Sequence, residues 1–119
     1  FRVLVEFIRE VGDNPNPAQL ALIGRLLANL VTLRRMSISV AGMLEAGKTP
    51  ITEAALIKDL GNTYERLVPE LIRVLAPAKT SRRFQNTLHQ CILHAPSFTL
   101  RGGTREILRG VIARGLGLR

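Results

Sequence analysis

The stretch NPAQLALIGRLLANLVTLRRMSISVAGMLEAG, from Asn16 to Gly47, decides the fold of this chain. Asn followed by Pro is typical of an N-cap and a first helical position, and a glycine commonly stands just after the last turn of a helix. These signals predict one helix from about residue 16 to 46. At 1.5 Å per residue it would be roughly 45 Å long, which is more than a lone globule of 119 residues needs.

Apolar side chains cover most of the circumference of this predicted helix. Its polar strip is narrow and contains Arg25, Asn29, Thr32 and Ser39. A helix of this kind is buried on more than one side, as in a bundle that also makes a subunit contact. The apolar positions are Leu20, Ile23, Leu27, Leu30, Val31, Ile38, Met43 and Leu44.

Further helices are predicted on both sides of this one. The opening FRVLVEFIRE has helical apolar spacing, and helices are expected from about 52 to 75, 82 to 94 and 104 to 115. No segment alternates with period two for long enough to form a sheet, so the predicted fold class is all-α. Between 52 and 75, apolar spacings of three and four predict a seam between nearly antiparallel helices. The seam residues are Ile57, Leu60, Tyr64, Leu67, Leu71 and Val74.

Charge is distributed unevenly along the chain. Residues 1 to 72 hold eight basic and eight acidic residues, whereas 73 to 119 hold nine basic residues and only Glu106, which accounts for the net charge of +8. A basic surface attracts the phosphates of nucleic acid, of a membrane surface, or of a cofactor or substrate. The alternative is a solvated basic face that offsets acidic residues elsewhere in the protein.

The single cysteine, Cys91, excludes an internal disulfide and any multi-cysteine metal site, and it fits a reducing cytoplasm. His89, Cys91 and His94 stand close together in the sequence. Because His89 and Cys91 are two residues apart, they point to different sides of a helix, and no metal site is predicted for the three residues. A nucleophilic Cys91 beside His94 is geometrically possible, but packing is its expected role. No apolar run approaches the roughly 18 residues of a membrane span, and we expect a soluble cytoplasmic protein.

The tail LRGGTREILRGVIARGLGLR, from Leu100 to Arg119, carries the clearest functional pattern. Gly102 and Gly103 permit a backbone turn that other residues resist, and Thr104 can cap the following helix, which leaves free N–H groups in front of it. An anion or a polar heterocycle could dock there. The alternative is an ordinary loop followed by a helix cap.

The tail motif GGTREILRGVIARGLGLR resembles the C-terminal signature of acyl-CoA dehydrogenases, in which a G-T-x-E/Q-I turn leads into a last helix. Upstream, LLANLVTLRRMSISVAGMLEAGKTPITEAALIKDL is similar to that family's long helix, its D/E-x-G turn and its A-x-x-K helix, with Lys58 at the lysine. The resemblance covers roughly 16 to 119. It implies an up-and-down four-helix bundle that packs into dimers and tetramers. We therefore expect residues 1–119 to be a single helical-bundle domain, a C-terminal fragment of a longer flavoprotein.

The resemblance also implies an activity, namely FAD-dependent α,β-dehydrogenation of acyl-CoA to 2,3-enoyl-CoA, as in fatty acid β-oxidation and lipid metabolism. It places Gly103, Thr104 and Glu106 against the flavin nucleotide, and Arg101 and Gly102 near the isoalloxazine ring and the acyl thioester. Glycines and cations at these positions would let backbone N–H groups and positive charge approach a diphosphate-bearing cofactor and a phosphorylated CoA ester.

Two positions depart from the family pattern. Many members carry the catalytic base, a glutamate, immediately before the G-T pair, where this chain has Gly102, and glycine cannot take a proton. No catalytic residue is therefore assigned here, and the base is expected before Phe1, as in members that carry it on the first helix, or absent, as in a base-free partner subunit of a heteromeric complex. The segment VLAPAK, with Ala76 and Lys79, stands where the family usually has glycines that approach the adenine end of FAD.

A basic helical nucleic-acid-binding module is the remaining alternative, and it rests on charge alone. The chain has one Tyr and no Trp, and no helix-turn-helix spacing supports this function. The resemblance implies as partners an acyl-CoA substrate, further subunits in a homo-oligomer or hetero-oligomer, and an electron-transfer acceptor. Neither nucleic acid nor a membrane span is expected. The isolated fragment is expected to be inactive.

Overall fold

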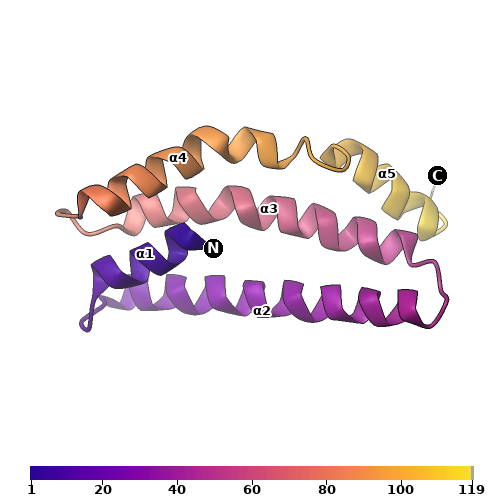
Figure 1. Ribbon diagram of the computed structural model, residues 1–119, viewed down its shortest axis with the longest axis horizontal. Helices are drawn as coiled ribbons and strands as arrows, with labels where there is room; N and C mark the ends of the chain where they lie inside the picture. The colour runs from indigo at the N-terminus through magenta and orange to yellow at the C-terminus, as the bar shows by residue number, and fades with distance from the viewer. Residues whose placement is uncertain (119) are drawn as a thin grey trace.

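The computed structural model describes residues 1–118, which form five helices and no strand (Figure 1). The all-α class predicted from the sequence is therefore confirmed. The helices are α1 (Arg2–Val11), α2 (Pro17–Glu45), α3 (Ile51–Leu75), α4 (Arg82–Phe98) and α5 (Arg105–Gly115).

The helices form an elongated bundle, 50 Å long and 25 by 23 Å across. α2 lies along one side of α3, and α4 followed by α5 lies along the other side (Figure 1). Successive helices from α1 to α4 alternate in direction, as predicted, and α5 continues in the direction of α4. The short α1 packs at one end only, where it contacts α2, α3 and α4. We call this end the four-helix end, and the opposite end, formed by α2, α3 and α5, the three-helix end.

The start of α2 is fixed by a capping box. The Asn16 side chain accepts a hydrogen bond from the backbone N–H of Gln19 at 2.9 Å, and the Gln19 side chain accepts one from the N–H of Asn16 at 3.0 Å. Gln19 also donates to the carbonyl of Leu75 at 2.9 Å, which ties α2 to α3. Pro17 is the first helical residue and Gly47 follows the helix at φ 71°, so the sequence signals placed this helix correctly.

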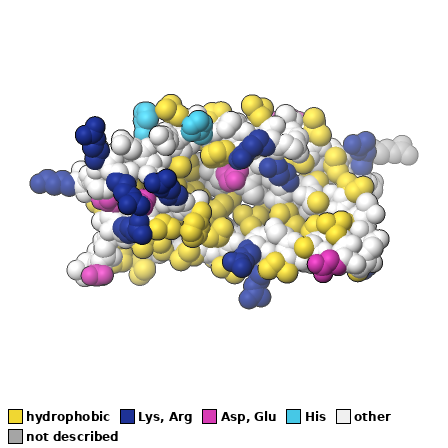
Figure 2. Space-filling view, in the orientation of Figure 1, with side chains coloured by type: hydrophobic (Ala, Val, Ile, Leu, Met, Phe, Trp, Pro, Cys, Tyr) yellow, Lys and Arg dark blue, Asp and Glu magenta, His cyan; other side chains and the backbone are white. Residues whose placement is uncertain are grey.

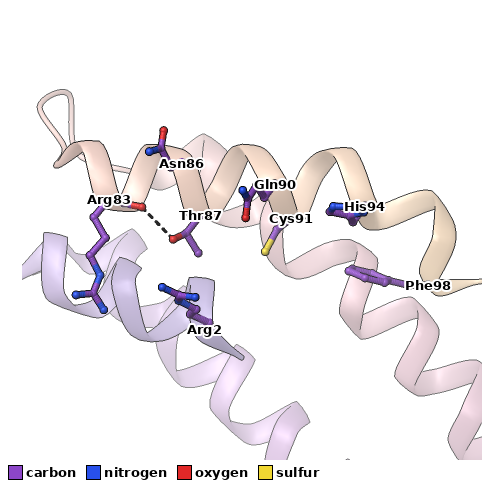
Figure 3. A pocket seen from close by; sticks show the side chains of 8 residues that line it. All are labelled: Arg2, Arg83, Asn86, Thr87, Gln90, Cys91, His94 and Phe98. Atoms are coloured by element: carbon purple, nitrogen blue, oxygen red, sulfur yellow. Dashed lines mark hydrogen bonds between the residues drawn. The ribbon is translucent and has the colours of Figure 1, made fainter.

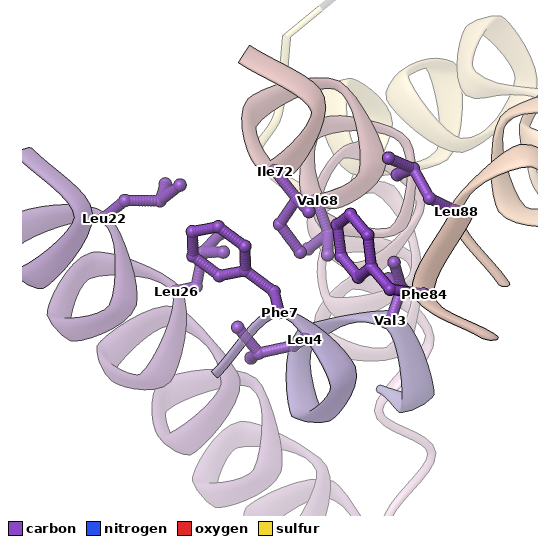
Figure 4. Close-up of a cluster of buried hydrophobic side chains, with 9 residues drawn as sticks. All are labelled: Val3, Leu4, Phe7, Leu22, Leu26, Val68, Ile72, Phe84 and Leu88. Carbon is purple, nitrogen blue, oxygen red and sulfur yellow. The ribbon is translucent and has the colours of Figure 1, made fainter. Parts of the chain in front are cut away.

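The hydrophobic core lies at the four-helix end (Figure 4). Phe7 of α1, Ile72 of α3 and Phe84 of α4 are almost completely buried there. Burial of a side chain of this size stabilises the folded state by about 1.5–3 kcal/mol, so this end has its own source of stability. The full cluster is Val3, Leu4, Phe7, Leu22, Leu26, Val68, Ile72, Phe84 and Leu88.

The predicted burial of α2 on more than one side does not occur within this chain. Its buried residues are Gln19, Leu22 and Leu26, whereas Val31 and Ile38 are 52% and 61% exposed. The reason is that α2 contacts only α1 and α3 among the described residues, and α1 covers one end of it. Apolar periodicity marks the faces of a helix that avoid water, but it does not identify what covers them.

The predicted seam on α3 is also only partly buried. Tyr64 and Leu71 pack against the core, but Leu60, Leu67 and Val74 are exposed, so the prediction is wrong for these three. The residues of α3 that are buried instead are Ala55, Asp59, Asn62, Val68, Pro69 and Ile72. α3 is enclosed from the sides of α4 and α5 as well as from α2, which shifts its buried stripe away from the seam.

α4 ends later than predicted, at Phe98 instead of about 94. Pro96 lies beyond the predicted end, and proline cannot donate a backbone hydrogen bond. The helix continues through it because Ala95 and Phe98 are half-buried beside α3. Packing against a neighbouring helix therefore outweighs the one hydrogen bond that is lost.

Candidate functional site at the turn between α4 and α5

The turn that joins α4 to α5 contains the glycine pair singled out in the sequence. Gly102 has φ 72° and Gly103 has φ 105°, a backbone region that residues with a side chain rarely adopt. The predicted backbone turn is therefore present, and both positions require glycine for conformational reasons.

A side chain at either glycine would not collide with neighbouring atoms. A Cβ atom on Gly102 would lie 3.5 Å from Cε of Lys58, and one on Gly103 would lie 3.6 Å from a methyl group of Leu108, both ordinary contact distances. Gly102 is exposed and Gly103 is half-buried. One side of the turn thus faces α3 and the other side is open to an approaching molecule.

Thr104 occupies the N-cap position of α5, as predicted, but its hydroxyl caps none of the backbone N–H groups of the first turn. The carboxylate of Glu106 lies there instead. Its pKa is lowered, first by a hydrogen bond from its own backbone N–H, then by the Thr104 hydroxyl, and further by the charges of Arg105 and Arg109. The first turn of α5 therefore holds a negative charge, as the dipole of a helix favours.

Arg101 is anchored beside the glycine pair by two weak contacts. Its guanidinium lies 5.2 Å from the centre of the Phe98 ring, within the range of a cation–π interaction. It also lies 3.6 Å from the carboxylate of Glu65 on α3. Because the Arg101 side chain is 63% exposed, these contacts orient it but leave its charge available to a ligand.

α5 is docked on α3 through one carboxylate. Asp59 is buried on α3, and its two oxygens lie 3.0 Å from Nε of Arg105 and 3.5 Å from Nε of Arg109. A buried carboxylate needs such partners, because removal of a charge from water is costly. The pairing fixes the start of α5, and hence the end of the glycine turn, against α3.

Sequence reasoning missed the side chains of α3 beneath this turn. Lys58, which contacts Gly102, was noted only through the resemblance, and Asn62 and Glu65 were not singled out. Asn62 is buried, and neither of its amide atoms has a hydrogen-bond partner. The spacing of four and three residues could have placed these side chains on one face, but only if the packing of α5 had been known.

Figure 2 shows basic side chains near the turn, close to hydrophobic surface between α2 and α3, and a denser group of them at the four-helix end. Together with the open glycine backbone, the basic side chains near the turn offer positive charge and N–H donors to a negatively charged or electron-rich group, whereas the Glu106 carboxylate already accepts a hydrogen bond in the first turn of α5. This chemistry suits a flavin nucleotide, which carries a diphosphate. The arginines in the turn and in α5 are Arg101, Arg105, Arg109 and Arg114.

The backbone conformation of the segment after α3 is not that of a glycine turn. Ala76 is the C-cap of α3, with φ −62° and ψ 144°, and it packs against the core. Lys79 is exposed. This conformation is open to any residue, so the absence of glycine at Ala76 causes no strain in the chain itself.

A second concave surface lies on α4 at the four-helix end (Figure 3). This groove has a volume of about 600 Å³ and is lined by residues of α4 and by Arg2 of α1. Cys91 and His94 lie on its wall, where Cys91 is half-buried and also packs against the core. Arg83 at its edge pairs with the buried Glu6 at 2.8 Å. Packing thus accounts for Cys91.

Two further observations concern residues 1–118. Within this range, no group of three or more His, Cys, Asp and Glu side chains is arranged to hold a metal ion. In the same part of the chain, every helix is too short or too polar to cross a membrane.

The chain matches a protein-family model. The family model described as acyl-CoA dehydrogenase, C-terminal domain, matches residues 6–117. Neither the curated proteins nor the solved structures gave a match to the chain.

Proposed function

Because the chain belongs to the acyl-CoA dehydrogenase family as its C-terminal domain, we propose that it forms one wall of the FAD site and part of the subunit interface in a longer enzyme. That enzyme converts an acyl-CoA into its 2,3-enoyl-CoA. The observation that carries the proposal is the exposed turn at Gly102 and Gly103, where two positive φ angles present bare backbone at the N-terminus of α5.

Each residue of the turn has a distinct part in this proposal. Gly103, Thr104 and Glu106 contact the flavin nucleotide, and Arg101 and Gly102 lie near the flavin ring and the acyl thioester. The anchoring of Arg101 on Phe98 and Glu65 supports this, since it holds a positive charge beside the turn. When bound, FAD accepts the hydride that leaves the β-carbon of the acyl-CoA.

The proton that leaves the α-carbon needs a base that this turn does not supply. Gly102 has no side chain, and the carboxylate of Glu106 is held by its own backbone N–H and by Thr104. We place the base before Phe1 in the parent protein. The isolated domain is then inactive, although it contributes to cofactor binding.

The proposed subunit interface lies on the uncovered apolar face of α2. Leu20 and Leu27, like Val31 and Ile38, are seven residues apart and share one stripe along the helix, and all four are at least 40% exposed. A contiguous apolar surface of this kind is typical of a protein–protein contact. Two shallow grooves between α2 and α3, of about 230 and 150 Å³, lie on the other side of α2, where Thr32 and Ser39 line them, and are separate from this stripe.

The absorbance spectrum of the full-length protein tests the cofactor part of the proposal. We expect a flavin band that bleaches when one class of acyl-CoA is added under anaerobic conditions. Gly103→Ala should weaken FAD binding because alanine resists φ 105°, whereas Gly110→Ala, within α5 and with open space around it, should not. A colourless wild-type protein would contradict the proposal.

A base-free partner subunit is the second candidate, and Gly102 favours it. In that case the domain completes a heteromeric acyl-CoA dehydrogenase whose other subunit carries the glutamate. A flavin that no acyl-CoA reduces until a companion subunit is added would support this function. A glutamate before Phe1 whose replacement by glutamine abolishes turnover would rule it out.

A further inference from the structure

Asn62 of α3 is an unusual buried group. The residue is 1% exposed, and both its Nδ2 and its Oδ1 lack a hydrogen-bond partner. Among the described residues, these are the only buried side-chain polar atoms in that condition. Native proteins pair almost all such atoms, because an unpaired buried amide loses its bonds to water without replacement. The amide therefore needs an explanation.

Its place in the fold puts it beneath the turn between α4 and α5. Lys58 and Glu65 stand four residues before and three residues after Asn62, on the same face of α3. Cε of Lys58 lies 3.5 Å from the Cβ position of Gly102, and the carboxylate of Glu65 lies 3.6 Å from the guanidinium of Arg101. The turn thus passes over the face that holds Asn62.

The backbone of the turn also has unused hydrogen-bonding groups. The N–H of Leu100 donates to Ser97, and the N–H of Leu108 donates to Thr104, but the N–H groups of residues 101–103 between them donate to no backbone carbonyl. The two glycines have no side chains to resist a shift toward α3. The short and adaptable turn that passes over the face of α3 holding Asn62 therefore carries N–H groups that no backbone carbonyl pairs.

We propose that Asn62 is a positioning residue for this turn. When a flavin nucleotide binds on the outer side, the backbone of Gly102 and Gly103 moves toward α3, and Asn62 donates through Nδ2 to a carbonyl of the turn and accepts through Oδ1 from one of its N–H groups. The inference rests on the proposed FAD site. Pairing of the amide adds to the affinity for the nucleotide, and by reciprocity the nucleotide orders the turn.

A positioning role predicts that replacement of Asn62 affects the stability of the unbound protein and the affinity for FAD differently. Leu has the same branched shape as Asn but no polar atoms, so Asn62→Leu removes an unpaired amide from the unbound protein and leaves its stability equal or higher. In the bound protein the same change removes two hydrogen bonds. A residue that only supported the fold would instead weaken stability and binding together.

The test uses the full-length protein as wild type, as Asn62→Leu, and as Asn86→Leu, a control at an exposed asparagine of α4. The dissociation constant for FAD is measured by absorbance titration, hydrogen–deuterium exchange is followed at residues 100–104 with and without FAD, and the melting temperature is taken without FAD. For Asn62→Leu we expect about tenfold weaker FAD binding, loss of the FAD-induced protection of the turn, and an equal or higher melting temperature. The control should match the wild type in all three.

Two other results would overturn the inference in distinguishable ways. If Asn62→Leu binds FAD as the wild type does, with the same protection of residues 100–104, Asn62 does not position the turn and the proposed FAD site stands. If the wild type itself binds no FAD, the proposed function fails and the inference fails with it. If Asn62→Leu loses its helical circular dichroism, Asn62→Ala is measured in its place. FAD binding and the protection of residues 100–104 are then compared with the wild type in the same way.

Discussion

The two ends of the bundle cover the same face of α2 to different extents. At the four-helix end Leu22 and Leu26 are buried, whereas Leu33 and Val40, on the same face toward the three-helix end, are only half-buried. The four residues belong to one continuous apolar stripe. The difference follows from α1, whose ten residues cover only one end of a 29-residue helix. An apolar face thus becomes core only where the chain supplies a helix to cover it.

Removal of an aromatic side chain from the four-helix end should have the largest effect. Phe7 has no exposed surface, so Phe7→Ala should lower the free energy of unfolding by about 3–5 kcal/mol through lost burial and the cavity left behind. Phe1→Ala is the matched control, because Phe1 is 79% exposed. Urea denaturation followed by far-UV circular dichroism measures both. Equal losses for the two variants would mean that the core does not lie at this end.

A smaller loss is expected where α5 meets α3 at the three-helix end. A Cβ atom on Gly115 would lie 2.9 Å from Cβ of Thr52 and collide with its hydroxyl, so Gly115→Ala should destabilise the protein by about 1–3 kcal/mol. Gly110→Ala lies in the same helix with nothing near it and should gain about 0.5–1 kcal/mol.

Urea denaturation of these two glycine variants measures the change in the free energy of unfolding, which should be a loss for Gly115→Ala and a gain for Gly110→Ala. A gain at both positions would show that α5 does not pack closely against α3. The pair therefore tests whether the three-helix end, although open on α2, is closed on the side of α5.

The sequence alone predicted the parts of this architecture that depend on local chemistry. The cap at Asn16, the proline after it and Gly47 placed α2 within one residue, and the turn at Gly102 and Gly103 was recognised from the backbone freedom of glycine. These signals act over a few residues, so a single chain is sufficient to find them.

The parts that failed depend on contacts between distant segments. Asp59 meets Arg105 across 46 positions of the sequence, and Asn62 is buried on α3, which the other four helices contact. In the sequence both resembled surface residues, because each is a polar residue in a helical pattern. The end of α4 was misplaced because packing beside α3 carries the helix past Pro96. Tertiary contacts of this kind are not encoded in local periodicity.

The smallest expected effect is a pH dependence at the four-helix end. The carboxylate of Glu10, at the end of α1, accepts hydrogen bonds from the hydroxyl and the backbone N–H of Ser81, the N-cap of α4, and these bonds lower its pKa. Because the folded-state pKa lies below the unfolded one, the stabilisation is complete above about pH 4.3, the ordinary glutamate value, and is lost as the pH falls through the lower folded value.

Melting temperatures of the wild type and Glu10→Gln at a series of pH values test this contact. The wild type should melt slightly higher at pH 6, and the difference should disappear in acid. A difference that persists unchanged at pH 2 would assign the effect to something other than ionisation of Glu10.

We propose that another protein surface covers the open face of α2, and sedimentation velocity of the full-length protein tests this proposal most directly. Val31→Lys combined with Ile38→Lys places two charges on the exposed apolar stripe, and Thr32→Lys combined with Ser39→Lys places the same charges on the polar strip of the same helix. We predict that the wild type and the polar-strip variant sediment as oligomers, whereas the apolar-stripe variant sediments as a smaller species with unchanged helical circular dichroism. An apolar-stripe variant that sediments like the wild type would contradict the claim.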